Sequence, residues 1–253
     1  MPVYGLLGRT LSHSFSKKYF TEKFAELGLN DHKYELFELD NINDIDILRK
    51  NAELKGFNIT VPYKQDIIPH LTSIDENASK IGAVNVVKIS NGNFHGYNSD
   101  FYGFQRSLKN RMGEILSSDK ALVIGTGGAS KAVTSALEDL NINYRVVSRT
   151  KVKGMLPYKE ISKGIIRENQ LIINTTPLGM SPDIENKPEL IYNALTSDHY
   201  LYDLIYNPLE TTFMKLGKYR GAQVKNGLEM LYLQAEKSWE FWTDRLYRLT
   251  DCI

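Results

Sequence analysis

The feature that most constrains this chain is a glycine-rich turn between a short apolar run and a helical pattern. The run Ala121–Ile124 is typical of a buried strand, VIGTGGAS covers residues 123–130, and a helical pattern follows over Lys131–Leu140. Gly125 permits a tight turn, and Gly127 lets the backbone approach an anionic ligand closely. The free N–H groups and the dipole at the start of a helix favour phosphate oxygens. The segment therefore predicts a phosphate cradle between a strand and a helix.

Three more apolar runs that are typical of strands follow this turn: Tyr144–Val147, Leu171–Asn174 and Tyr200–Leu204. Helical or polar segments separate them, as in chains of strand, helix and strand units. Such units form parallel sheets with right-handed crossovers. The second half of the chain is therefore predicted to be a Rossmann-like doubly wound parallel sheet.

The first half of the chain also alternates strands and helices. Apolar runs predict strands, and one helical pattern lies between the first two of them, which gives this order: strand Val3–Leu7, helix Ser16–Leu27, strand Tyr34–Leu39, strand Gly56–Val61, strand Ala83–Ile89, strand Phe94–Tyr97. Asn91 and Gly92 supply the turn residues of a hairpin. Further on, helices are predicted over Ser99–Met112 and Leu228–Leu249. The whole chain is predicted to be an α/β protein.

The tip of the strand after the glycine turn predicts which dinucleotide binds. An enzyme that uses NAD commonly has an acidic residue there, which binds the ribose 2′-hydroxyl. This chain has instead a polar and basic set that we expect to bind cofactor: Ser148, Arg149, Thr150 and Lys153. Arg149 can donate charge-assisted hydrogen bonds to a 2′-phosphate. The set favours NADP, although surface lysines and arginines also occur as solvated loops.

Composition limits the other classes of partner. The chain has 31 Lys and Arg residues against 30 Asp and Glu, so its net charge of +1 gives no reason to expect nucleic acid. No apolar stretch approaches the length of a membrane-spanning helix. Cys252 is the one cysteine, which excludes an internal disulfide and a cysteine zinc site. We expect a cytoplasmic protein that needs no metal and binds neither nucleic acid nor membrane.

Six segments, in this order, resemble the shikimate dehydrogenase family, and the resemblance runs from Tyr4 to about Trp239. The segments are S-x-S at Ser14 and Ser16, N-x-T-x-P-x-K at residues 58–64, G-A-x-N at residues 82–85, a polar run ending at Asp100, G-x-G-G-A at residues 125–129, and G-x-x-M-L-x-x-Q at residues 227–234. The resemblance implies NADPH-dependent, reversible reduction of 3-dehydroshikimate to shikimate.

The resemblance also implies roles for individual residues. Lys64 and Asp100 would be the catalytic pair, because the proton of the C3 hydroxyl must leave when hydride leaves C3. Whether Lys64 accepts this proton or stabilises charge stays open. The substrate would contact a further set of polar residues: Ser14, Ser16, Thr60, Asn85, Tyr206 and Gln234. The cofactor would contact the glycine turn and two later positions: Gly125, Thr126, Gly127, Gly128, Ala129, Leu204 and Gly227.

The assignment of both Ser14 and Gln234 to one substrate predicts that the last helix returns to the first domain. We therefore expect a substrate-binding and catalytic domain made of residues 1–100 plus 228–253, and an NADP-binding domain over residues 101–227. The chain departs from the family pattern at Arg9, Thr10 and Lys17. These departures bear on how the substrate loop binds its ligand more than on which reaction is catalysed.

Two alternatives to this function remain open. One is a quinate/shikimate dehydrogenase that uses NAD or has relaxed specificity, and the other is a non-catalytic dinucleotide-binding sensor on the same fold. In each case the partner is a small molecule, and a monomer or a homodimer is expected.

Overall fold

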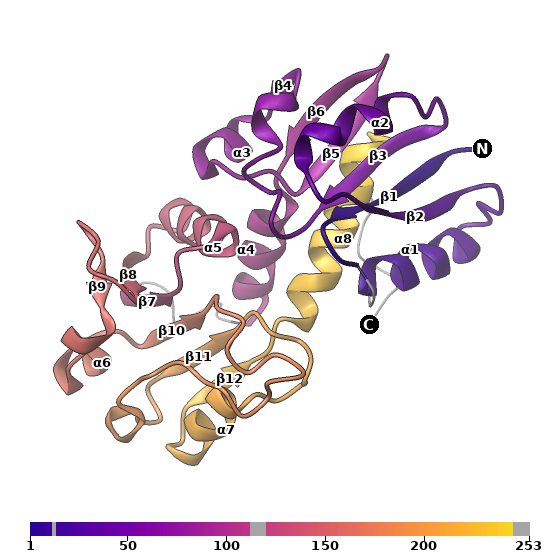
Figure 1. Ribbon diagram of the computed structural model, residues 1–253. Coiled ribbons are helices and arrows are strands. Elements are labelled where there is room, and N and C mark those ends of the chain that lie inside the picture. Colours follow the sequence, from indigo (N-terminus) through magenta and orange to yellow (C-terminus); the bar gives the residue numbers. More distant parts are fainter. Residues whose placement is uncertain (12–13, 112–119, 245–253) are drawn as a thin grey trace. The chain divides into compact units, whose positions relative to one another are not determined.

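The computed structural model describes residues 1–11, 14–111 and 120–244, and the chain divides into two compact units (Figure 1). The first unit is Met1–Ser99 with Ala235–Ile253, and the second is Asp100–Gln234. The elements before Ser99 are β1 Val3–Gly8, α1 Phe15–Glu26, β2 Lys33–Glu38, η1 Ile42–Ile45, α2 Asp46–Arg49, β3 Leu54–Ile59, η2 Ile68–His70, β4 Ser73–Ile74, α3 Glu76–Ile81, β5 Val86–Ser90 and β6 Asn93–Tyr97. Those that follow are α4 Ser99–Arg111, β7 Lys120–Ile124, α5 Gly128–Asp139, β8 Asn143–Ser148, β9 Leu156–Pro157, η3 Tyr158–Glu160, α6 Lys163–Glu168, β10 Leu171–Asn174, η4 Tyr192–Ala194, β11 Tyr200–Asp203, α7 Thr212–Tyr219, β12 Gln223–Lys225 and α8 Leu228–Thr243.

The first unit contains a mixed sheet in the order β2-β1-β3-β5-β6-β4. Strand β1 pairs in parallel with β2 and β3, whereas β5 pairs antiparallel with β3 and β6. Asn91 and Gly92 close the β5–β6 hairpin with φ values of 50° and 75°. Two successive positive φ values are what a tight hairpin turn requires, and asparagine and glycine tolerate them best. The predicted hairpin is confirmed.

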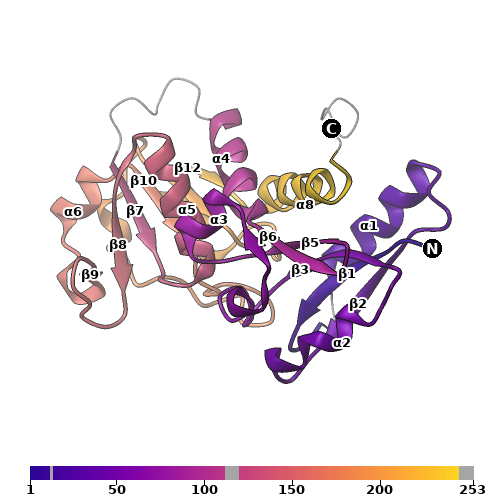
Figure 2. The same cartoon turned by 90° about the horizontal axis from the view of Figure 1, so that it is seen from above.

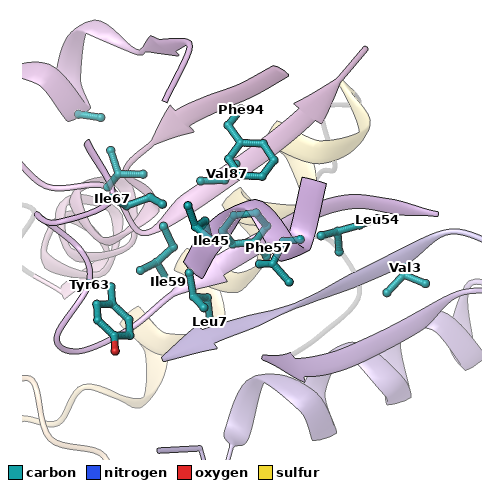
Figure 3. Packing of buried hydrophobic residues seen from close by; sticks show 13 residues of the cluster. Val3, Leu7, Ile45, Leu54, Phe57, Ile59, Tyr63, Ile67, Val87 and Phe94 are labelled. Atoms are coloured by element: carbon teal, nitrogen blue, oxygen red, sulfur yellow. The ribbon is translucent and has the colours of Figure 1, made fainter. Parts of the chain in front are cut away.

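The two faces of this sheet bury different helices, because successive side chains of a strand point to opposite sides. Val3 and Leu7 of β1 join the cluster that contains Ile45 and Leu48 from η1 and α2, and Figure 3 shows this packing around Phe57. Figures 1 and 2 show α1 and α2 on opposite sides of β1 and β2.

On the α1 side of the sheet, Tyr4 packs with aromatic residues of α1 and α8, among them Phe20, Trp239 and Trp242. Gly56 of β3 is needed there, because a Cβ atom at this position would lie 2.4 Å from the Trp242 ring. The end of α8 therefore belongs to the core of the first unit.

The second unit is built on a sheet in the order β12-β11-β10-β7-β8-β9. All five strand pairs are parallel. Helices α6 and α7 pack on one face through Ile166 and Phe213. On the other face, Phe104 of α4 packs against Tyr202 of β11. This is the predicted doubly wound parallel sheet, and its strand order reverses direction between β7 and β10, where such sheets bind ligands.

The chain passes between the units after Ser99 and again inside α8, after Gln234. The sequence predicted the second passage at Leu228, seven residues earlier. The first turns of α8 group with the second unit because Glu229 bonds Ser107 at 3.0 Å and Asn110 at 2.7 Å, and also bonds Lys225. The contacts with Ser107 and Asn110 join side chains that are distant in the sequence.

The predicted strands and helices over the described residues match the structure to within a few residues at each end. The predicted strands all occur, but the short elements α2, α3, α6, β4, β9 and β12 were not predicted individually. Met112, residues 245–249 of the predicted last helix and Cys252 lie outside the described residues.

Candidate active site

The glycine turn has the geometry that the sequence predicted. Strand β7 ends at Ile124, and Gly125 follows with φ of +117°. A Cβ atom on Gly125 would lie 2.5 Å from Thr175 Oγ1, whose hydroxyl donates to the Ile124 carbonyl at 2.6 Å. Only glycine combines this φ with this close approach. The turn after β7 is thereby joined to the loop after β10.

The N-terminus of α5 is suited to an anion. Its cap is Gly127, which has no side chain to accept a hydrogen bond from the first-turn N–H groups. A Cβ atom on Gly127 would meet no other atom within 4 Å, so the space above the turn is open. Thr126 is exposed and Gly128 and Ala129 are half-buried, whereas Ser130 is buried against the sheet. A small residue in that last position lets helix and strand pack closely, and the arrangement fits a dinucleotide pyrophosphate.

The basic tip of β8 lies next to the glycine turn, because Gly125 N–H donates to the Val147 carbonyl at 3.1 Å. Ser148 is buried and its hydroxyl accepts from Thr150 N–H at 3.3 Å. Arg149, Thr150 and Lys153 are exposed. Cationic side chains thus stand beside the phosphate cradle, where a 2′-phosphate would need them.

The ends of β11 and β12 bring the two later cofactor candidates together. Gly227 N–H donates to the Ile205 carbonyl at 3.0 Å, and a Cβ atom on Gly227 would lie 2.1 Å from the Leu204 carbonyl oxygen. Any side chain at Gly227 would therefore displace backbone. Tyr206 follows in the same loop, where burial raises the pKa of its hydroxyl.

In the first unit, backbone hydrogen bonds place three predicted residues near one another. Val84 N–H donates to the Lys64 carbonyl at 2.7 Å, and Ile59 N–H donates to the Asn85 carbonyl at 2.9 Å. Thr60 follows Ile59 directly. Thr60 and Lys64 are half-buried, and Asn85 is buried. The N-x-T-x-P-x-K and G-A-x-N segments therefore form one polar locus.

Asn85 also holds the start of α4. Its Oδ1 accepts from Ser99 N–H at 2.7 Å, and its Nδ2 donates to Ser99 Oγ at 3.0 Å. Asn98 Nδ2 donates to the Ala83 carbonyl at 2.9 Å. Asp100 comes next in the first turn of α4 and is 8% exposed. The polar run that ends at Asp100 is thus fastened to the G-A-x-N segment.

Ser14 and Ser16 stand at the start of α1. Ser14 Oγ caps this helix by accepting from Lys17 N–H at 3.2 Å, and both serines are half-buried. Ser16 hydrogen-bonds the hydroxyl of Tyr34, which opposes the rise that burial causes in the pKa of Tyr34. The Ser14 hydroxyl accepts from Lys17 N–H and can still donate its own proton, as binding a carboxylate requires, whereas Ser16 donates to the Tyr34 oxygen and must turn its proton from Tyr34 to bind one.

A buried polar network that the sequence did not reveal continues from Tyr34. The Tyr34 hydroxyl donates to Asn58 Oδ1 at 2.9 Å, and Asn58 Nδ2 donates to Ser238 Oγ at 2.8 Å. Ser238 Oγ lies 3.1 Å from Ser99 Oγ, which bonds Asn85. Asn58 belongs to a recognised motif and could have been found from it, whereas Tyr34 and Ser238 carried no signal.

The remaining predicted residues are distributed between the units. Gln234 is half-buried in α8, where its Nε2 donates to the Leu231 carbonyl at 2.9 Å, and it groups with the second unit. Of the departures, Arg9 stacks over the Tyr63 ring at 5.8 Å, and Lys17 pairs with Glu35 at 3.7 Å.

Among the described residues, no three His, Cys, Asp or Glu side chains group as metal ligands would. Within residues 1–11, 14–111 and 120–244, no helix is both long and apolar enough to cross a membrane.

Known proteins resemble the chain along nearly its whole length. The family model described as the shikimate dehydrogenase substrate binding domain matches residues 6–87. A shikimate dehydrogenase (NADP(+)) of Clostridium beijerinckii is 40% identical, over 96% of this chain and 93% of that protein. The crystal structure of shikimate dehydrogenase from Aquifex aeolicus has a TM-score of 0.88 at 33% identity, covering 98% of this chain and 94% of that one. The Thermus thermophilus enzyme in complex with NADP(H) and shikimate has a TM-score of 0.85 at 30% identity, covering 98% of this chain and 95% of that one. The chain belongs to the shikimate dehydrogenase family.

Proposed function

We propose that this protein is an NADP-dependent oxidoreductase that interconverts shikimate and 3-dehydroshikimate, a step towards chorismate and the aromatic amino acids. The observation that carries the proposal is the 40% identity, over 96% of the chain, to a shikimate dehydrogenase (NADP(+)). The glycine turn and the polar locus around Lys64 support it, because they are the two parts that such a reaction needs. Residues 1–100 with 228–253 bind substrate, and residues 101–227 bind NADP.

The cofactor site is made by chain atoms that suit its charges. Gly127, Gly128 and Ala129 present backbone N–H groups to the pyrophosphate. Arg149, with Ser148, Thr150 and Lys153 around it, binds the 2′-phosphate. Thr126 and Gly125 shape the turn, and Leu204 and Gly227 contact the nicotinamide end. Bound NADP supplies the hydride acceptor, so the protein itself has to bind, align and handle a proton.

Each proposed substrate residue binds the group of the substrate that suits its side chain. Ser14 and Ser16 donate hydrogen bonds to the carboxylate, and the ring hydroxyls bind Thr60, Asn85, Tyr206 and Gln234. Lys64 bonds the C3 oxygen and handles its proton, and Asp100 orients Lys64 and binds a neighbouring hydroxyl. Asn85 already spends one N–H and one lone pair on Ser99, which leaves one of each for substrate and fixes the orientation of its amide.

The direct test is an absorbance assay of NADP reduction by the purified protein with shikimate. We expect shikimate-dependent reduction, and its absence would overturn the proposal. Lys64→Ala should lower kcat by about 10²-fold or more, which is typical of losing a positioned acid or base. Lys55→Ala is the matched control, because Lys55 is an exposed lysine of β3 whose Nζ bonds the Ala52 carbonyl. It should leave turnover unchanged.

The same assay separates the alternatives. Equal rates with NAD and NADP, or turnover of quinate, would indicate a quinate/shikimate dehydrogenase of relaxed specificity. Binding of NADP without turnover would indicate a sensor. We propose a cytoplasmic enzyme that acts as a monomer or homodimer, which sedimentation equilibrium would check.

A further inference from the structure

A buried carboxylate stands at the carboxyl end of β11 in the second unit. Asp203 is 0% exposed, and three donors bond it. Asn174 Nδ2 and Ile205 N–H donate to Oδ1 at 3.0 Å and 3.1 Å, and the Thr211 hydroxyl donates to Oδ2 at 2.6 Å. An ionised carboxylate accepts at both oxygens, so all three bonds suit its charged form.

The first of these donors extends the network to the neighbouring strand. Asn174 ends β10 and is itself 0% exposed. Its Oδ1 accepts from the Thr176 N–H at 3.0 Å and from the Thr176 hydroxyl at 2.6 Å. Its backbone carbonyl accepts from Leu204 N–H at 3.0 Å. Asp203 therefore fastens the loop after β10 as well as the loop after β11.

These two loops lie where an open parallel sheet binds its ligand. Thr175 joins the first loop to the glycine turn after β7, and Leu204 and Tyr206 belong to the second. We infer that Asp203 is a positioning residue that holds both loops in the shape that receives the nicotinamide end of NADP. The inference rests on the proposed function for the identity of the cofactor.

The charge of Asp203 makes this arrangement sensitive to pH. Burial raises the pKa of Asp203 to about 6, against the hydrogen bonds from Thr211, Ile205 and Asn174, which lower it. Burial, Tyr158 and, to a smaller extent, Asp203 raise the pKa of the neighbouring titratable side chain Tyr192. Below pH 6 the carboxyl gains a proton that the Thr211 hydroxyl must accept, so the Thr211 bond reverses. Affinity for NADP should therefore fall as pH falls through about 6.

Three variants separate a positioning role from a merely structural one. Asp203→Asn can keep every bond, because its Oδ1 accepts from Asn174 and Ile205 while its Nδ2 donates to Thr211. Because this neutral side chain reproduces the protonated carboxyl, the variant should bind NADP at every pH with the weaker affinity that the wild type shows below pH 6, and so lose the pH dependence near 6. Thr211→Val removes one donor to the carboxylate and should move the midpoint of the pH dependence upward. Asp203→Leu should raise the Kd and KM for NADP about tenfold, since buried donors lose their acceptor.

The matched control is His199→Leu, which removes a buried polar side chain just before β11, at its opposite end. His199 is 3% exposed, and its ring bonds Thr196 N–H and the Ile166 carbonyl, each at 3.0 Å. It should lower the melting temperature but leave the KM for NADP unchanged. The KM for shikimate should also stay unchanged in His199→Leu, whereas Asp203→Leu should raise it, because Tyr206 lies in the loop that Asp203 holds.

Two results would overturn the inference: an unchanged pH profile in Asp203→Asn, or an equal rise in the KM for NADP in His199→Leu. If Asp203→Leu does not fold, the pH profiles of Asp203→Asn and Thr211→Val still test the inference. Direct NADP titration separates this inference from the proposed function. Wild-type protein that binds NADP but does not oxidise shikimate would contradict the function alone.

Discussion

Arg149 is the residue on which the choice between the two dinucleotides depends. It follows β8 directly and is exposed beside the phosphate cradle, where NAD enzymes place a carboxylate. A guanidinium forms charge-assisted hydrogen bonds with a 2′-phosphate, whereas the 2′-hydroxyl of NAD carries no negative charge for it to bind. Ser148, the residue directly before Arg149, is buried.

Arg149→Ala should therefore weaken NADP selectively. The loss of one or two charge-assisted hydrogen bonds, about 1.5 to 3 kcal/mol each, predicts a rise of at least about tenfold in the KM for NADP. The KM for NAD should stay nearly constant, and steady-state kinetics with both cofactors checks this. Arg145→Ala is the control, since Arg145 lies on β8, just before Arg149 in the chain, but pairs with Glu168 at 3.9 Å. Equal effects on both cofactors would contradict the assignment.

Gly227 shows what the structure adds at this scale. The family resemblance alone suggested it, without a physical reason. The Leu204 carbonyl oxygen, 2.1 Å from where a Cβ would stand, provides that reason, because a side chain there would force the loop after β11 to move.

At the scale of elements, one buried hydroxyl joins α8 to the sheet of the first unit. Ser238 is 0% exposed, accepts from Asn58 of β3 and lies beside Ser99 at the start of α4. Asn58 also donates to the Asn85 carbonyl at 3.3 Å. The helix and the polar locus are thus held in one register by hydrogen bonds that water cannot replace.

Ser238→Ala should destabilise the protein by about 1 to 3 kcal/mol, because the Asn58 amide is left short of a partner in a buried position. For a chain of this size, each 1 kcal/mol corresponds to about 2 to 4 °C in melting temperature. The KM for shikimate should rise severalfold while the Kd for NADP stays unchanged. Thr243→Ala is the control, since the Thr243 hydroxyl bonds the Trp239 carbonyl of its own helix at 2.8 Å. An unchanged KM for shikimate would show that the network is structural only.

At the scale of the whole molecule, the buried carboxylate of Asp203 links folding to pH. Its pKa rises from an ordinary value of 3.8 to about 6 in the fold, so the folded chain holds this proton more tightly than the unfolded chain. The resulting stabilisation is complete below the unfolded pKa and is lost as pH rises through about 6. At neutral pH the ionised, buried Asp203 therefore lowers the stability of the protein. We attribute its presence to the two loops that it holds in place.

From pH 4 to pH 7 the difference in the free energy of unfolding between the wild type and Asp203→Asn should move against the wild type by on the order of 3 kcal/mol, the equivalent of the rise in pKa. Urea unfolding at a series of pH values measures it. A difference that does not change with pH would show that the carboxyl titrates alike in both states.

The sequence alone determined the features that depend on near neighbours in the chain. The glycine turn, the Asn91–Gly92 hairpin, the helical periods and the basic tip at Arg149 are each set by side chains a few residues apart. For this reason they could be predicted, together with the parallel sheet that their order implies. Short elements such as α3 and β12 escaped, because tertiary contacts rather than periodicity stabilise them.

Only the tertiary structure decided how distant polar groups pair. Asn58 and Ser238 are 180 residues apart, and Asn174 and Asp203 are 29 apart on adjacent strands. Each pair depends on which strand neighbours which, in what register, and on which face the side chains fall. A buried polar atom must find its partner in the assembled core, so no local pattern in the chain reveals it.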